Sequence, residues 1–187
     1  VIDKINNSNS NPTPKLGQIE STNPCGEQPL LPWEPCTLGS INLSNHVKKV
    51  NGKSIVDYQK LEYTAKLATH FLDNVIDMSM YVLPEIEHMS KGNRRIGLGV
   101  MGWAEMLIKL EIPYDSEEAI TLAEELMSFI NLKSLEASEE LAAKRGVYYN
   151  FTDSIYDEKG KYFRGHAARP RNCARTTIAP TGTIAIT

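Results

Sequence analysis

The residues whose types could do chemistry gather in one proline-rich stretch, STNPCGEQPLLPWEPCTLGSINL at 21–43. An amide, a thiol and a carboxylate stand at alternate positions there, as Asn23, Cys25 and Glu27. The surrounding prolines exclude a helix, because proline lacks a backbone donor and clashes with the preceding turn. Side chains alternate in an extended segment, so these three would project to the same side. The spacing therefore predicts a small polar constellation around a cysteine.

Three kinds of chemistry could use this cysteine. An ionic nucleophile needs a base to form thiolate, and Glu27 on the same side would disfavour thiolate by like-charge repulsion. A zinc site needs ligands at short spacing, whereas Cys25 and Cys36 are 11 positions apart. A neutral thiol that loses a hydrogen atom is not opposed by Glu27.

Such a thiyl radical could take a hydrogen atom from a carbon next to a hydroxyl. Glu27 would then accept the hydroxyl proton and Asn23 would orient a second hydroxyl. Cys36 could supply reducing equivalents together with a partner thiol. The alternative interpretation is that the free cysteines are small buried hydrophobic residues.

A second motif, PTGTI, comprises Pro180, Thr181, Gly182, Thr183 and Ile184. A turn with glycine lets consecutive backbone N–H groups point into one concavity, and the threonine hydroxyls add donors. Such a nest can bind phosphate. The alternative is an ordinary turn between two apolar runs.

The segment RIGLGV at 95–100 is typical of a short buried strand or of a tight crossing at which glycines let backbones approach. The glycines in 97–102 have the G-x-G-x-x-G spacing of a dinucleotide loop, but no acidic residue is placed for a ribose and Trp103 is bulky. We therefore expect close packing of the strand against its helix. Arg94 and Arg95 could be solvated or paired with acidic residues, and we assign them no function.

The elements around these motifs read as a helix-rich α/β fold with two or three short strands. Asp57 can cap a long helix that runs to about Leu83. A capping box that starts at Asp115 predicts a second long helix, to about Arg145. The polar segment 1–20 should be extended or mobile.

Length and composition exclude several classes of protein. A chain of 187 residues holds one domain or a substantial piece of a larger one. With 41% hydrophobic residues, a net charge of −3 and no block of like charge, nothing favours a nucleic-acid or membrane partner. No apolar run approaches the roughly 20 residues that span a bilayer. Three cysteines without a regular framework favour a reducing, cytoplasmic setting. The start at Val1 and the apolar end PTGTIAIT suggest a fragment.

Four motifs together resemble the large catalytic chain of ribonucleotide reductases. They are NPCGE, then PCTLGSINL with its cysteine 11 positions later, RRIGLGVMGWAEML and IAPTGTI, in this order across 21–187. Each motif alone is short, but the ordered set is specific. The sequences of these motifs most resemble those of the adenosylcobalamin-dependent class, class II.

The resemblance implies a role for each matching residue. Cys25 would be the thiyl radical that abstracts the 3′ hydrogen, Glu27 would take the 3′ hydroxyl proton, and Asn23 would bind the substrate hydroxyls. Cys36 would be one half of the redox dithiol, with a partner cysteine far upstream and absent from this chain. Residues 180–184 would hold the substrate phosphates, and no residue is expected to bind a metal ion.

The resemblance also implies a fold and partners. Residues 21–187 would form part of a ten-stranded α/β barrel, including its finger loop, and Cys173 would be a small buried residue. The cofactor would be adenosylcobalamin, with an external dithiol reductant such as thioredoxin and a homodimer in the full-length enzyme. The isolated chain should be inactive. Two alternatives stay open: a non-catalytic nucleotide- or phosphate-binding module with structural cysteines, and an ionic cysteine enzyme.

Overall fold

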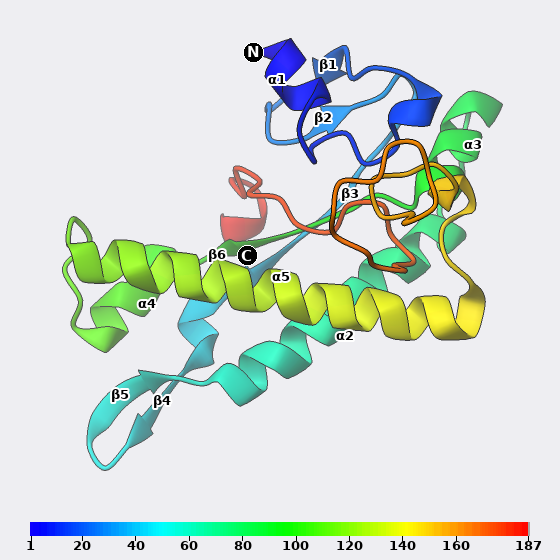
Figure 1. Ribbon diagram of the computed structural model, residues 1–187. Helices are drawn as coiled ribbons and strands as arrows, with labels where there is room; N and C mark the ends of the chain where they lie inside the picture. The colour runs from blue at the N-terminus through cyan, green and yellow to red at the C-terminus, as the bar shows by residue number, and fades with distance from the viewer. Residues whose placement is uncertain (187) are drawn as a thin grey trace.

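The computed structural model describes residues 1–186 as a helix-rich fold with short strands (Figure 1). The α-helices are α1 (Ile2–Asn6), α2 (Tyr58–Met78), α3 (Pro84–Asn93), α4 (Trp103–Leu110) and α5 (Glu117–Arg145). The strands are β1 (Ser21–Thr22), β2 (Pro29–Leu30), β3 (Thr37–Asn42), β4 (Val47–Val50), β5 (Lys53–Val56) and β6 (Ile96–Met101). Short 3-10 helices are η1 (Pro14–Leu16), η2 (Leu43–His46), η3 (Tyr149–Phe151) and η4 (Ile184–Ile186).

Strand β6 is the centre of a small parallel arrangement. It pairs in parallel with β3 over its whole length. On its other edge Leu98 forms a parallel bridge with Thr176, and the amide of Leu98 donates to the carbonyl of Arg175 at 2.8 Å. Helices connect these parallel segments, as in α/β folds. The expected fold class is confirmed, as a partial piece in which residues 1–186 form no closed barrel.

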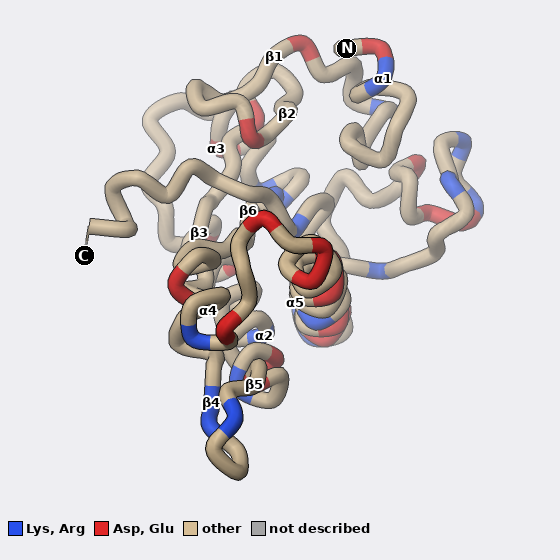
Figure 2. Tube along the Cα trace, turned by 90° about the vertical axis from the view of Figure 1, so that its left-hand side faces the viewer, with Lys and Arg blue, Asp and Glu red and all other residues tan. Residues whose placement is uncertain are grey.

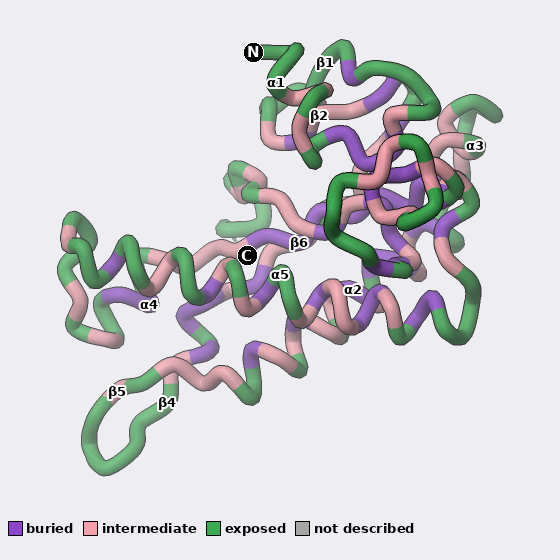
Figure 3. Tube along the Cα trace, in the orientation of Figure 1, coloured by how far each residue is buried: buried purple, intermediate pink, exposed green. Residues whose placement is uncertain are grey.

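The core lies where α2 and α5 cross the two parallel strands. Helix α2 packs against α5 and against both β3 and β6, and Figure 3 shows buried stretches on these elements as well as in the loops near α3. Inside it, the Thr69 hydroxyl donates to the Ser134 hydroxyl at 2.9 Å. The buried core residues are Ile41, Leu43, Leu61, Ala65, Leu72, Ile76, Ile96, Leu98, Met106, Leu126 and Ile130.

Helix α2 begins as predicted and ends earlier. The Asp57 side chain accepts a hydrogen bond from the main chain of the first turn. The helix ends at Met78 instead of about Leu83, because Ser79 adopts an extended conformation and its hydroxyl donates to a carbonyl of the last turn at 2.7 Å. Pro84 then opens α3, and a residue that precedes proline is itself held extended.

Helix α5 has the predicted end and a shifted start. Its N-cap is Ser116, whose hydroxyl accepts from the Ala119 amide at 3.2 Å, so the capping box that Asp115 predicts is wrong by one residue. Its last residue is Arg145, and Gly146 closes it with a positive φ of 84° and a ψ of 158°, a conformation that glycine adopts without strain.

Segment 1–20 is not simply extended. It contains α1 and η1, and Asn11 and Ile19 are each only 1% exposed. The Asn6 side-chain oxygen accepts from the Ile19 amide at 2.7 Å. Local side-chain hydrogen bonds thus fold a composition that predicts an extended segment. The division of the chain between 1–20 and 21–187 stays a prediction.

The glycines of β6 allow close packing, but against a neighbouring segment rather than against the following helix. A Cβ at Gly99 would lie 2.3 Å from the carbonyl oxygen of Thr177. A Cβ at Gly97 would lie 2.7 Å from the Thr177 side chain and 3.0 Å from the Cys36 sulfur. Any larger side chain would therefore push the 174–177 segment away from β6.

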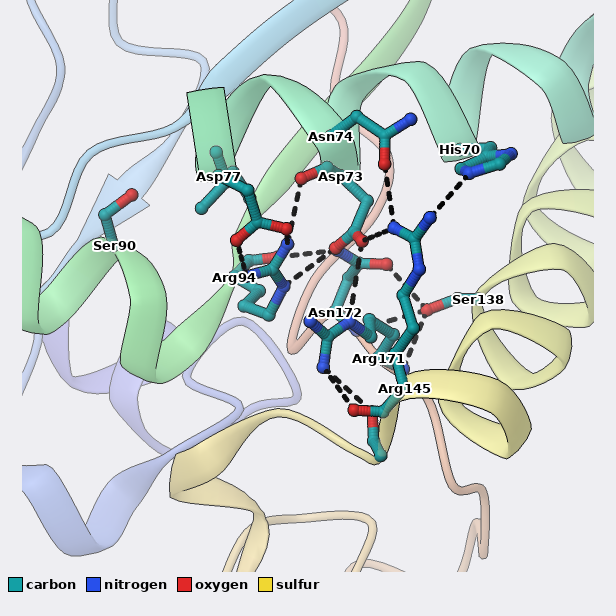
Figure 4. Close-up of polar contacts among 12 residues, drawn as sticks. His70, Asp73, Asn74, Asp77, Ser90, Arg94, Ser138, Arg145, Arg171 and Asn172 are labelled. Carbon is teal, nitrogen blue, oxygen red and sulfur yellow. Dashed lines mark hydrogen bonds and ion pairs between the residues drawn. The ribbon is translucent and has the colours of Figure 1, made fainter. Parts of the chain in front are cut away.

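A buried polar network joins α2 to β6 (Figure 4). Asp73 of α2 is fully buried, and its Oδ1 accepts from Arg94 Nε at 2.8 Å and from Asn172 Nδ2 at 2.9 Å. The same guanidinium donates to both Asp77 oxygens, at 2.7 and 2.9 Å. Arg94 thereby holds the pKa of the Asp77 carboxyl below its usual range.

Two further arginines face the other oxygen of Asp73. Arg145 Nη1 and Arg171 Nε each lie 3.5 Å from Asp73 Oδ2. Arg171 also donates to the carbonyls of Arg145 and Gly146, at 3.0 and 3.1 Å. One buried carboxylate therefore ties together α2, the end of α5, the start of β6 and the loop at 171–172.

On the surface, α5 is acidic in its first half, where Glu117, Glu118, Glu124 and Glu125 occur without a basic residue, and charges of both signs mix in its second half (Figure 2). In the part of the chain that the structure describes, no helix is both long and apolar enough to span a bilayer.

Replacement of Asp73 by Asn should destabilise the protein by about 3 kcal/mol, because removal of one partner leaves buried guanidinium charge uncompensated. Asp115→Asn is the matched control, since Asp115 is exposed, and it should change the free energy of unfolding by less than about 0.5 kcal/mol. Urea unfolding measures both. Equal stabilities for the two variants would contradict the central role of Asp73.

Candidate functional site

The expected catalytic residues lie in the loop of a β-hairpin. Strands β1 and β2 are antiparallel, with Ser21 opposite Leu30. Asn23 closes the loop between them: its amide donates to the Gln28 carbonyl, and its side-chain oxygen accepts from the Gln28 amide, both at 3.1 Å. The amide of Gly26 donates to the Asn23 carbonyl at 3.0 Å. The loop at 23–28 is therefore a turn with defined internal bonds.

The extended conformation that the alternating spacing predicts is wrong. Gly26 has a φ of +85°, which breaks an extended run, and the Asn23 side chain bonds the backbone in place of a neighbouring strand. Asn23, Cys25 and Glu27 nevertheless share one short loop.

The three side chains differ in accessibility. Cys25 is exposed, and in the described part of the chain no hydrogen bond reaches its thiol. Glu27 is half-buried, and its Oε2 is buried without a hydrogen-bond partner. A buried carboxylate oxygen in this state is costly unless a donor meets it. It is therefore suited to accept a hydroxyl hydrogen.

The structure brings Cys36 to this loop. Gln28 Nε2 donates to the Cys36 sulfur at 3.3 Å, and Glu27 lies close enough to act on the thiol electrostatically. Burial raises the pKa of Cys36 to about 11, while the Gln28 amide and the Arg95 guanidinium oppose that rise. Cys36 is thus a largely protonated thiol at neutral pH.

A buried ion pair supports the same region. Glu34 Oε1 lies 3.0 Å from Arg95 Nε, and both side chains are almost fully buried. Asn93 Nδ2 donates to the same oxygen at 2.6 Å. The Cys173 sulfur lies 4.0 Å from it, and burial strongly raises the pKa of this thiol. Cys173 is fully buried, which agrees with its interpretation as a small buried residue.

Next to Glu27 opens a cleft of about 900 Å³. Arg95 and Arg175 line it, and each is more than nine-tenths buried. Arg95 Nη2 and the Nε and Nη1 atoms of Arg175 have no hydrogen-bond partner. Asn131 of α5 and Thr177 complete this part of the wall. The lining of the cleft therefore includes several hydrogen-bond donors and one carboxylate, that of the candidate catalytic residue Glu27.

The predicted phosphate turn stands apart from the hairpin loop. Gly182 and Thr183 are exposed. Thr181 has a φ of 56° and its hydroxyl donates to the Pro180 carbonyl at 2.8 Å. The segment that leads to the turn does touch the loop, since the Thr177 hydroxyl donates to the Glu27 carbonyl at 2.9 Å. The turn and the loop are thus connected through residues 177–180.

The sequence does not predict a role at this site for three residues that the structure places there: Gln28, Glu34 and Arg95. One local indication existed: Arg95 directly precedes a fully apolar strand, where a charged side chain is buried only if a partner meets it. The partner, Glu34, lies far away in the sequence. Among residues 1–186, no group of three acidic, histidine or cysteine side chains is arranged to hold a metal ion.

Comparisons with known proteins give this geometry its context. The family model for the ribonucleotide reductase barrel domain matches residues 1–187. The chain is 51% identical over 185 residues to a vitamin B12-dependent ribonucleoside-diphosphate reductase of Thermoplasma acidophilum. This match covers 99% of the chain and 22% of that protein. A reductase of the same name from Mycobacterium tuberculosis (strain CDC 1551 / Oshkosh) is 48% identical, over 99% of the chain and 25% of that protein.

A solved structure of a ribonucleotide reductase subunit has a similar fold. The class Id ribonucleotide reductase alpha subunit of Actinobacillus ureae superposes with a TM-score of 0.70 at 25% identity, over 96% of this chain and 32% of that one. The chain spans about a quarter of the length of the curated relatives above. With the family model matched from end to end, this chain belongs to the ribonucleotide reductase family and is a piece of its barrel domain.

Proposed function

We propose that this chain is the part of a ribonucleotide reductase that carries the hydrogen-abstracting cysteine. The full-length protein would reduce ribonucleoside diphosphates to 2′-deoxyribonucleotides. One observation carries the proposal: a hairpin loop presents the Cys25 thiol at its exposed tip, between Asn23 and Glu27. The names of the two curated relatives support the diphosphate as substrate.

In this reaction the Cys25 thiyl radical takes the hydrogen atom from C3′ of the ribose, so the C–H bond breaks and an S–H bond forms. Glu27 accepts the proton of the 3′ hydroxyl; its partnerless Oε2 supports that role. Asn23 would bind a substrate hydroxyl through its side-chain nitrogen, because its oxygen is used by Gln28.

Two electrons must come from a pair of thiols that end as a disulfide, and Cys36 would be one of them. Its high pKa, about 11, keeps it protonated and able to give hydrogen. Its partner would belong to another part of the full-length protein, because the family resemblance puts that cysteine far upstream, whereas Cys173 stands beside the phosphate motif. An external dithiol such as a thioredoxin would then restore the pair.

Residues 180–184 would bind the substrate phosphates. The backbone amides around Gly182 and the Thr183 hydroxyl are the donors that suit this role. The hydrogen bond from Thr177 to Glu27 supports it, because it fixes the segment leading to this turn beside the catalytic loop.

The cofactor would be adenosylcobalamin, as the names of the curated relatives suggest. It would supply the radical equivalent that oxidises the Cys25 thiol. The residues present fit that use in one respect: the Cys25 thiol is exposed and free of hydrogen bonds in the described chain, so a bulky group can reach it. A homodimer and a cytoplasmic location complete the proposal.

In the full-length protein, Cys25→Ser should reduce deoxynucleotide formation to background, because a serine hydroxyl cannot replace the thiol as a hydrogen-atom acceptor. Formation by the unchanged protein should require adenosylcobalamin and a dithiol. Nucleotide binding, measured in parallel, should persist in the variant. Deoxynucleotide formation that survives in Cys25→Ser would rule out the radical role, and a binding module with structural cysteines would predict no formation by either protein.

Residues 1–187 alone should form no deoxynucleotide, even with adenosylcobalamin and a dithiol present. The chain has only three cysteines, and Cys173, beside the phosphate motif, does not stand where the family resemblance puts the partner of Cys36. Product analysis with radiolabelled ribonucleoside diphosphate measures this. Turnover by the isolated chain would refute the claim that the missing thiol lies elsewhere.

A further inference from the structure

Gln28 connects the candidate catalytic loop to the candidate redox cysteine. Its main chain makes both hydrogen bonds that close the loop with Asn23, each at 3.1 Å. Its side-chain nitrogen donates to the Cys36 sulfur at 3.3 Å. The residue is 5% exposed, so this geometry is enclosed by the protein. A single buried residue thus contacts Asn23 and Cys36 at once.

The Cys36 sulfur has little freedom to leave this contact. A Cβ at Gly97 would approach it to 3.0 Å, so the backbone of β6 closes one side. The thiol itself donates only a long contact to the Thr37 carbonyl, at 3.9 Å. Among the described residues, the amide of Gln28 is therefore the one hydrogen-bond donor aimed at this sulfur.

The charged and titratable groups around Cys36 oppose one another. Burial raises its pKa, and Glu34 and Glu27 raise it further, whereas the Gln28 amide and Arg95 lower it. A hydrogen bond to a thiolate is stronger than one to a thiol, because the acceptor is charged. The Gln28 amide consequently favours the deprotonated sulfur over the protonated one.

We propose that Gln28 is a positioning residue: its side-chain amide holds the Cys36 sulfur at a fixed place beside the loop that Asn23 closes. It acts through these two residues. Its meaning for ribonucleotide reduction rests on the proposed function. The contact between Gln28 and Cys36, and its effect on the Cys36 thiol, are independent of the proposed function.

The test uses the full-length protein, reduced with dithiol and desalted, with Gln28→Leu and Gln28→Glu as variants. Gln18→Leu is the matched control, since it makes the same change at an exposed position. The alkylation rate of Cys36 by iodoacetamide is followed from pH 8 to 11 by mass spectrometry of each cysteine peptide. Cys25 in the same sample serves as the internal reference.

Gln28→Leu should slow Cys36 alkylation about tenfold at each pH below the pKa, because the thiolate loses its donor. Gln28→Glu should slow it further, since a carboxylate replaces the amide beside the sulfur. Both profiles should move to higher pH, while Gln18→Leu and the Cys25 rates stay unchanged.

A residue that only fills space would give a different result. Leucine nearly keeps the volume of glutamine, so Cys36 alkylation would not slow in Gln28→Leu. Unchanged or faster Cys36 alkylation in Gln28→Leu would overturn the inference. Failure of the proposed function is seen separately, as turnover that survives Cys25→Ser, because the alkylation profile requires no turnover.

Discussion

The structure depends on two consecutive guanidinium groups buried at the start of its central strand. Arg94 is held by Asp73 and Asp77 of α2, and Arg95 by Glu34 in the segment that follows the hairpin. Buried charges are tolerated only when partners and hydrogen bonds compensate their desolvation. The start of β6 is therefore fixed on two sides, by helix α2 and by the segment that follows the hairpin with the candidate catalytic loop.

This constraint reaches the candidate site through contacts of β6. Because Gly99 has no side chain, the 176–177 segment packs directly against the strand, and Thr177 then bonds the carbonyl of Glu27. On the other edge of β6, β3 follows Cys36, which Gln28 holds. The loop that carries the thiol is thus positioned by the strand beneath it, while its tip stays free to meet another group.

The parts of this architecture that are encoded locally could be predicted from the sequence. The Asp57 cap, the Gly146 helix end and the apolar strand β6 follow from short-range rules, and they are confirmed. The conformation of the loop could not be predicted, because one side-chain bond from Asn23 decides between an extended segment and a turn. The Glu34–Arg95 ion pair could not be predicted either, because the two residues are far apart in the sequence and meet only in the folded chain.

The central claim is that the Cys25 thiol removes the hydrogen atom from C3′ of a ribonucleotide. The most direct test compares single turnovers of 3′-deuterated and unlabelled ribonucleoside diphosphate by the full-length protein with adenosylcobalamin. If Cys25 breaks this C–H bond, the deuterated substrate should form deoxynucleotide more slowly. Equal rates for the two substrates, under conditions where chemistry limits the turnover, would contradict the account.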